Sequence, residues 1–279
     1  MAGSWYPENA RLLADRVDDL LSVASAPSSP PRDVLALIEP HAGFQYSGQV
    51  AAHGFRAVAA GEFARVLLVG PSHYGRFRGA AVPDADEYRT PLGPVDLDRE
   101  ALAELGALPG VTTSNEPFRP EHSLEAEIPF LQRVLDPGWR LLPVLIGGGT
   151  SGSAAARVAS ALEPFLGPST LVVISSDFTH FGPRFGYVPF RADVPEKLRE
   201  LDMGAVRLIE AGDVEEFEEY LSRTGATVCG RDAIDVLLRM LPANTACSLA
   251  AYDTSGRITG EWDHSVSYAA LVFRRPAEG

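Results

Sequence analysis

VLALIEPH, at residues 34–41, is a run of apolar residues that stops at an acidic residue, a proline and a histidine. Similar runs occur in RVLLVGPSH, at residues 65–73, and in TLVVISSDFTH, at residues 170–180. Continuous apolar runs of this length are typical of parallel strands that are buried on both faces of a sheet. Because open parallel sheets bind ligands at the carboxyl ends of their strands, we expect the three histidines to converge on one site.

The rest of the chain alternates strands and helices. We predict further strands at residues 140–146, 246–253 and 265–274, and the last two are expected to form an antiparallel pair at an edge of the sheet. Helices are predicted near residues 8–24, 47–60, 98–107, 121–135, 153–165, 193–210, 213–223 and 230–241.

Two stretches interrupt this alternation. Residues 74–97 are expected to be a long irregular excursion, and APSSPPRD, at residues 26–33, is interpreted as a linker between an outer helix and the sheet. The whole pattern predicts an α/β fold, with a central, mostly parallel sheet flanked by helices, in a single domain over residues 1–279.

The composition excludes several classes of protein. The net charge is −13, so we expect no nucleic-acid partner, which normally requires a basic patch. No apolar stretch is long enough to span a membrane, and we see no signal peptide, so no membrane association is predicted. Two cysteines cannot form a disulfide framework, which favours a reducing, cytoplasmic location.

Two histidines follow consecutive strand–helix units. His41 lies in PHAGFQYSG and His73 in GPSHYG, where glycine and proline shape a sharp exit from a buried strand. One such histidine is more often structural, but the repetition favours a joint role in binding a metal. Ser47, in the first motif, offers a hydroxyl to cap the following helix.

The third strand is followed by SSDFTHFG, which places Asp177 and His180 three residues apart. Imidazole titrates near neutral pH, so His180 is a candidate general base. Asp177 is a candidate acceptor for a hydrogen bond from an imidazole, which would fix the tautomer of that ring. The alternative is that Asp177 caps the following turn.

Cys229 directly precedes a predicted helix in VCGRDAIDVLLRML. The helix dipole and the unpaired N–H groups favour a thiolate there, and a thiolate is a ligand for zinc, copper or iron. The alternative is a small buried hydrophobic residue. Cys247, inside an alternating apolar run, is interpreted in that second way.

EHSLEAEIPF is expected to begin a helix and carries His122 with Glu121, Glu125 and Glu127. We interpret the acidic residues as a solvated helix face and as charges at a helix start. His122 differs, because an imidazole at a helix start can reach into a cleft.

Gly147, Gly149 and Gly152, in IGGGTSGSAAARV, have the G-x-G-x-x-G spacing of dinucleotide-binding loops. The next acidic strand end, at Asp177, lies farther away than the usual ~20 residues. We therefore favour a glycine-rich turn that allows close backbone approach over a nucleotide site.

Six blocks occur in a fixed order: AGSWYP, PHAGFQYSG, GPSHYG, EHSLEAEIPFLQ, SSDFTHFG and CGRDAI. With these blocks the chain resembles the MEMO family over nearly its whole length. Members of that family occur in bacteria and archaea beside AMMECR1-like and radical-SAM proteins, and in animals as a signalling mediator. The family is similar to the catalytic subunits of class III extradiol dioxygenases, which open catechol rings with non-haem iron(II) and O₂, so the resemblance implies a single α/β domain of that type.

The resemblance also implies site residues. It places metal ligands on His41, His73 and Cys229, a general base on His180, and a further pocket residue on His122. The dioxygenases use two histidines and a carboxylate, whereas Cys229 stands in place of the carboxylate. A thiolate still binds iron(II), but it also accepts copper or zinc and is open to oxidation if exposed.

The function predicted from these features is a metal-dependent dioxygenase or related redox enzyme that acts on a small phenolic or catechol-like molecule. Its cofactor would be a divalent transition metal, iron(II) in the first place, and His180, His122 and Asp177 would be the catalytic residues. The alternatives are a peptide- or protein-binding module without catalysis, and a protein that handles copper or iron in the same pocket. AMMECR1-like and radical-SAM proteins are partners that the resemblance implies.

Overall fold

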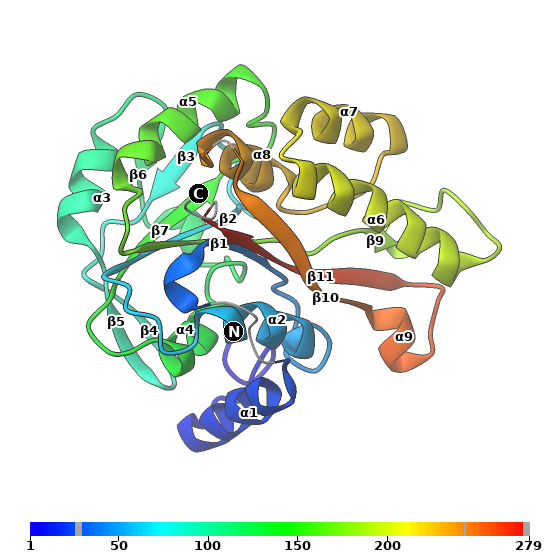
Figure 1. Ribbon diagram of the computed structural model, residues 1–279, viewed down its shortest axis with the longest axis horizontal. Helices are drawn as coiled ribbons and strands as arrows, with labels where there is room; N and C mark the ends of the chain where they lie inside the picture. Colours follow the sequence, from blue (N-terminus) through cyan, green and yellow to red (C-terminus); the bar gives the residue numbers. More distant parts are fainter. Residues whose placement is uncertain (26–29, 243, 276–279) are drawn as a thin grey trace.

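A computed structural model describes residues 1–25, 30–242 and 244–275 (Figure 1). A mixed β-sheet forms its centre, and the strands follow one another across the sheet in the order β10–β11–β1–β8–β2–β7–β3–β6, with β9 paired to β11 off this path. The strands of this sheet are β1 (Val34–Glu39), β2 (Arg65–Pro71), β3 (Ala80–Val82), β6 (Val111–Thr113), β7 (Arg140–Ile146), β8 (Thr170–Ser175), β9 (His180–Phe181), β10 (Ala246–Thr254) and β11 (Ser265–Arg274).

Four neighbouring strands, β1, β8, β2 and β7, are parallel and form the centre of the sheet. Their middle residues are buried, because helices cover both faces, and this explains why the sequence is apolar at every position instead of at alternate ones. Leu37 pairs with Val173, and Val173 pairs with Leu68, so the strands run in step. Glu39 consequently lies level with Ser175 where β1 and β8 end.

The two C-terminal strands form the predicted antiparallel edge. β10 is the outer strand, and β11 is antiparallel both to β10 and to β1. The α/β class with a central, mostly parallel sheet flanked by helices is therefore confirmed.

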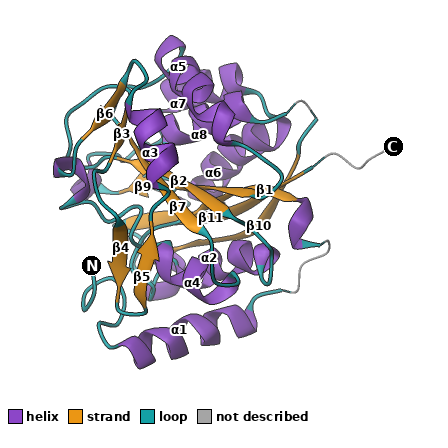
Figure 2. Ribbon diagram, turned by 90° about the vertical axis from the view of Figure 1, so that its left-hand side faces the viewer, coloured by secondary structure: helices purple, strands orange, loops and turns teal. Residues whose placement is uncertain are grey.

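Helices lie in two layers, one on each side of the sheet (Figure 2). The helix α2 packs against β1, β10 and β11, and α1 and α4 pack against α2, whereas α8 packs against β2 and β8 on the other side with α5 and α7 beside it. The helices are α1 (Ala10–Val23), α2 (Gly48–Phe55), α3 (Arg99–Gly106), α4 (Ile128–Val134), α5 (Ser153–Leu162), α6 (Val194–Ala211), α7 (Val214–Thr224), α8 (Arg231–Met240) and α9 (Ser255–Thr259). None of the helices in the described part of the chain is long and apolar enough to cross a membrane.

Gly54, in α2, is required by close packing against the sheet. A Cβ added at this residue would overlap the Oε1 atom of Glu39, whose side chain is completely buried. A glycine inside a helix costs conformational entropy, but here the absence of a side chain makes room for the carboxyl group.

The segment at residues 74–97 is more regular than predicted. It contains β3, which extends the sheet beyond β7, and a separate hairpin of β4 (Glu87–Thr90) and β5 (Gly93–Asp96). Strands of three or four residues carry little periodic signal, so the sequence pattern did not reveal them. Of the predicted linker, residues 26–29 lie outside the described residues, and Pro31–Asp33 form a short 3₁₀ turn.

The helix predicted to begin at EHSLEAEIPF begins later, at Ile128. Residues 123–127 are turns instead, because the Glu121 carboxylate accepts hydrogen bonds from the backbone N–H groups of His122 and Ser123. Pro129 occupies the first turn of α4, where its missing N–H group has no cost. The prediction for Ser47 is also wrong: its hydroxyl donates to the carbonyl oxygen of Ala42 and makes no hydrogen bond to the helix.

Candidate metal centre

The carboxyl ends of three adjacent parallel strands carry the predicted polar residues. His41 lies two residues after the end of β1, His73 two residues after β2, and Asp177 two residues after β8. Because β8 lies between β1 and β2, these residues meet at one edge of the sheet, as expected for ligand sites of open parallel sheets.

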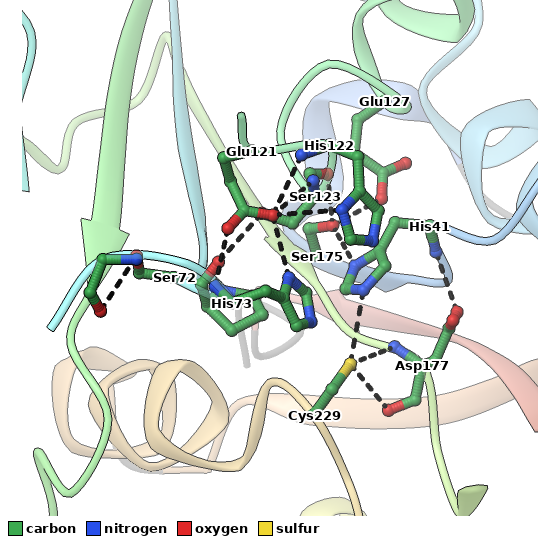
Figure 3. Close-up of polar contacts among 12 residues, drawn as sticks. His41, Ser72, His73, Glu121, His122, Ser123, Glu127, Ser175, Asp177 and Cys229 are labelled. Atoms are coloured by element: carbon green, nitrogen blue, oxygen red, sulfur yellow. Dashed lines mark hydrogen bonds and ion pairs between the residues drawn. The ribbon is translucent and has the colours of Figure 1, made fainter. Parts of the chain in front are cut away.

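Three imidazoles meet at this edge (Figure 3). His41, His73 and His122 each offer one ring nitrogen, and these three atoms lie within 4.8 Å of one another. The His73 and His122 rings are stacked, with centroids 4.6 Å apart, whereas the His41 ring stands edge-on to both. Imidazole nitrogens at this spacing form a group that could hold a metal ion.

Glu121 fixes the orientation of His73. One carboxylate oxygen lies 2.8 Å from Nδ1 of His73, and the other accepts the backbone N–H of His73 at 2.6 Å. The carboxylate also accepts the backbone N–H groups of His122 and Ser123. Burial raises the pKa of Glu121, but these hydrogen bonds and the adjacent His73 ring outweigh burial, and the pKa falls to about 2. An ionised carboxylate therefore holds Nδ1 of His73 and leaves Nε2 as the free donor atom.

His41 is held by a neutral partner. Its Nδ1 atom lies 2.7 Å from the hydroxyl oxygen of Ser175, and its backbone N–H donates to Oδ1 of Asp177 at 2.9 Å. The ring is 1% exposed, and burial, together with the neighbouring histidines, lowers its pKa well below the ordinary value. The neutral imidazole that results is the form that binds metals.

The Cys229 sulfur lies on the other side of the His41 ring from Ser175, 3.3 Å from the Nε2 atom of His41. The backbone N–H of Asp177 points at the same sulfur from 3.1 Å. Burial and the Asp177 charge raise the pKa of this thiol well above its ordinary value, so in the metal-free protein the expected thiolate is replaced by a neutral thiol. The helix dipole of α8 is too weak to reverse this, because the cost of burying a charge is larger.

Asp177 was predicted to accept a hydrogen bond from an imidazole, and among the described residues it accepts the backbone N–H of His41 instead. His180 Nε2 lies 4.0 Å from Oδ2 of Asp177, beyond hydrogen-bond distance, and the other carboxylate oxygen holds the His41 backbone. Burial raises the pKa of Asp177 to about 7. Burial in the first place, with electrostatic repulsion from the neighbouring imidazoles, lowers the pKa of His180 to about 4, so this ring is neutral at neutral pH and can accept a proton.

His122 lies between two other rings. Its imidazole stacks on the indole of Trp5, with centroids 4.3 Å apart, and on His73 from the other side. Burial, together with the His73 charge, lowers its pKa to about 4. The prediction that His122 reaches into a cleft agrees with this position, although the residue precedes a turn and not a helix.

A cavity of about 580 Å³ opens onto these rings. His41, His73, His122 and His180 line it, and further aromatic side chains, including those of Trp5 and Tyr268, form other parts of the wall. This volume suits a small organic ligand, and the aromatic wall with a few polar groups is typical of such sites.

The acidic residues of EHSLEAEIPF are not the solvated face that was predicted. Glu121 and Glu127 are 2% and 1% exposed, and Glu125 is bonded by the Tyr6 hydroxyl. The helical pattern misled the assignment, because in turns the acidic side chains point inward to hydrogen-bond the backbone and Ser175.

The glycine-rich loop is occupied by the protein's own carboxylates. The N–H groups of Gly149 and Thr150 donate to Oδ2 of Asp232, and that of Gly152 donates to Glu218. A Cβ at Gly147 would overlap the carbonyl group of Phe77. The close backbone approach that was expected is therefore present, and it is made with the segment around Phe77.

Sequence reasoning missed the residues that hold the histidines, namely Glu121, Ser175 and Glu127. A signal for Ser175 existed, because a serine that ends an otherwise apolar buried strand needs a polar partner. Glu121 directly precedes His122, but only the folded chain brings it to His73.

Comparisons with known proteins agree with this architecture. Residues 1–272 match the family described as Memo-like protein. The chain is 32% identical to the human protein MEMO1 and 33% identical to MEMO1 of Xenopus laevis, in both cases over 96% of this chain and 94% of the relative. It is also 32% identical to the memo-1 homolog of Caenorhabditis elegans, over 97% of this chain and 80% of that relative.

A solved structure gives the same fold at lower similarity. The crystal structure of the uncharacterized protein JW3007 from Escherichia coli K12 superposes with a TM-score of 0.54 at 13% identity, and covers 85% of this chain and 99% of the other. The nearly full-length family match and the identities above 30% show that the chain belongs to the MEMO family.

Proposed function

We propose that this protein is a metal-dependent enzyme, a non-haem iron(II) dioxygenase or related redox enzyme that acts on a small phenolic or catechol-like molecule. The observation that carries the proposal is the orientation of the two strand-end histidines. Their Nδ1 atoms are bonded to Ser175 and Glu121, which leaves the Nε2 atoms of His41 and His73 as donors toward the same space.

The donor set fits a transition metal. We assign His41, His73 and Cys229 as ligands. The Cys229 sulfur lies 3.3 Å from Nε2 of His41, although the three ligand atoms that lie within 4.8 Å of one another belong to His41, His73 and His122. Two imidazoles and a sulfur suit iron(II), copper or zinc better than magnesium or calcium. When bound, the metal would supply Lewis-acid and redox chemistry to the substrate and to O₂.

His180 is suited to remove a proton from a phenolic hydroxyl. Its Nε2 atom is buried, has no hydrogen-bond partner among the described residues, and belongs to a ring that lines the cavity. His122 would orient the substrate, since Trp5 and His73 fix the plane of its ring from both sides. Asp177 would support the site by holding the His41 backbone and by contributing charge 4.0 Å from His180.

The ligand set is tested by element analysis of protein purified without oxygen. We expect about one equivalent of metal in the wild type, and loss of metal in both His41→Ala and Cys229→Ala. His122→Ala should keep the metal, because His122 is assigned to the substrate. His53→Ala is a matched control, since His53 is in α2 and its Nδ1 atom accepts the backbone N–H of Ser25. If Cys229→Ala retains the metal and His122→Ala loses it, the third ligand is His122 and the assignment of Cys229 is wrong.

Catalysis is tested by adding catechol-type substrates to the iron-loaded protein. We expect ring cleavage by the wild type and no turnover by His180→Ala, which should retain its metal. Full turnover by that variant would remove His180 from the mechanism. Tight metal uptake without turnover of any phenolic substrate would favour the handling of copper or iron, and capture of a peptide by the metal-free protein would favour a binding module.

A further inference from the structure

Ser175 lies behind His41 and makes three short polar contacts with its one hydroxyl group. Its oxygen lies 2.7 Å from Nδ1 of His41, 2.7 Å from the carbonyl oxygen of Ser123, and 2.8 Å from Oε1 of Glu127. All three partners are fixed in the buried interior, and Ser175 itself is completely buried (Figure 3). Each of these contacts needs one proton, and buried polar groups of this kind are normally paired with one another.

Counting donors and acceptors gives one satisfactory arrangement. A hydroxyl group has one proton to donate and two lone pairs that accept. The carbonyl oxygen of Ser123 can only accept, so the Ser175 proton points at Ser123. The contacts to His41 and to Glu127 are then satisfied only if both of these groups donate to Ser175. His41 therefore carries its proton on Nδ1, and Glu127 carries a proton on its carboxyl group.

The surroundings of Glu127 agree with a neutral carboxyl group. Glu127 is 1% exposed, and its Oε2 atom has no hydrogen-bond partner within the described residues. A second buried carboxyl group, that of Glu39, lies near it and disfavours a negative charge on either. Burial of this kind raises the pKa of Glu127 well above its ordinary value.

We propose that Ser175 and the neutral Glu127 are positioning residues that keep the His41 proton on Nδ1 and so leave Nε2 available as a donor to a metal. The assignment of the tautomer stands on the hydrogen bonds alone, whereas its use in binding a metal rests on the proposed function. The two strand-end histidines are then held in different ways, His73 by an ionised carboxylate and His41 by a neutral hydroxyl–carboxylic acid pair.

The first test measures the tautomer of His41 in metal-free protein. Nitrogen-15 NMR of histidine-labelled protein distinguishes Nδ1–H from Nε2–H, and the His41 signals are those lost in His41→Ala. We expect Nδ1–H in the wild type and a shift toward Nε2–H in Ser175→Ala, where Nδ1 has lost its acceptor. Thr170→Val is the matched control, because Thr170 lies on the same strand and its hydroxyl donates to the carbonyl oxygen of Phe165. An Nε2–H tautomer in the wild type, or an unchanged tautomer in Ser175→Ala, would overturn the proposal.

The second test examines Glu127 and does not depend on the folding of the serine variant. Infrared difference spectra between the wild type and Glu127→Gln should contain the C=O band of a protonated carboxylic acid. The amide of the new side chain can still donate to Ser175, so His41 should keep Nδ1–H. A difference spectrum with carboxylate bands in place of the acid band would refute the assignment.

The third test links the tautomer to the metal. The Kd for iron(II), measured by titration without oxygen, should rise roughly 10–100-fold in Ser175→Ala, which is typical for loss of a group that holds a metal-binding histidine. It should change little in Thr170→Val. If the wild type binds no metal while the tautomer is as expected, the proposed function fails and the positioning of His41 stands. If the wild type binds metal and Ser175→Ala binds it equally well, the role in metal binding is wrong.

Discussion

Replacement of Glu121 by glutamine removes one charge and keeps the shape of the side chain. In the native protein the carboxylate accepts the ring Nδ1–H of His73 and the backbone N–H groups of His73, His122 and Ser123. A glutamine side chain has only one acceptor atom, and its amide group would face N–H donors. Glu121→Gln should therefore leave buried donors without partners and loosen the two separate segments that carry His73 and His122.

The magnitude follows from the pKa of this carboxyl group. Folding lowers the pKa from an ordinary value of 4.5 to about 2, which corresponds to about 3 kcal/mol at about 1.4 kcal/mol per pKa unit. Because the folded state binds its proton less tightly than the unfolded state, this stability is present above about pH 4.5 and is lost as the pH falls toward 2. The side chain is 2% exposed, so solvent screens little of this effect.

Urea denaturation of the wild type and Glu121→Gln tests this reasoning. We expect the free energy of unfolding to differ by about 3 kcal/mol at pH 7, and the difference to shrink as the pH is lowered toward 3. Glu116→Gln is the control, since Glu116 is an exposed residue of the same segment that pairs with Arg119, and it should change stability by less than about 1 kcal/mol. A Glu121→Gln protein as stable as the wild type at pH 7, or a difference independent of pH, would refute the account of this carboxylate.

Two further predictions concern packing and pH. Gly54→Ala should destabilise the protein by about 1–3 kcal/mol in urea denaturation, since its Cβ would overlap the Glu39 carboxyl group. In a Glu39→Ala background the same change should stabilise the protein by about 1 kcal/mol, because alanine has the higher helix propensity. Equal effects of Gly54→Ala in both backgrounds would contradict this contact. Burial and the Glu218 carboxyl group raise the pKa of Asp235 from 3.8 to about 7. Between these two values the folded state holds a proton that the unfolded state releases. The resulting contribution to the free energy of unfolding should therefore be lost as the pH rises from about 4 through 7. Asp235→Asn should remove that part of the pH dependence in thermal or urea unfolding, and an unchanged profile would show that Asp235 is not protonated.

The central strands, and the polar residues that follow them, were predictable because burial on both faces of the sheet requires an unbroken apolar run. The strands Val34–Glu39, Arg65–Pro71 and Thr170–Ser175 each begin at the first residue of the run from which they were predicted. The position of His41 and His73 at strand ends was predictable for the same reason, since parallel strands share one carboxyl edge.

The groups that surround the histidines were not predictable in this way. Glu121 resembles a helix-start charge in the sequence, and its role appears only when the turn brings it to His73. The state of the Cys229 thiol was predicted from the helix dipole, whereas burial and the charge of Asp177 dominate in the folded protein. Such balances depend on distances across the fold that local patterns do not contain.

The amides of the loop at residues 149–152 are already bonded by carboxylates of the same chain. Asp232 and Glu218 sit where a nucleotide phosphate would sit, and they are tethered to the same polypeptide. An incoming phosphate would have to compete with anions present at a high effective concentration, so the tethered groups prevail. Glycine spacing alone therefore does not identify a nucleotide-binding protein; the deciding question is whether the loop amides are still free.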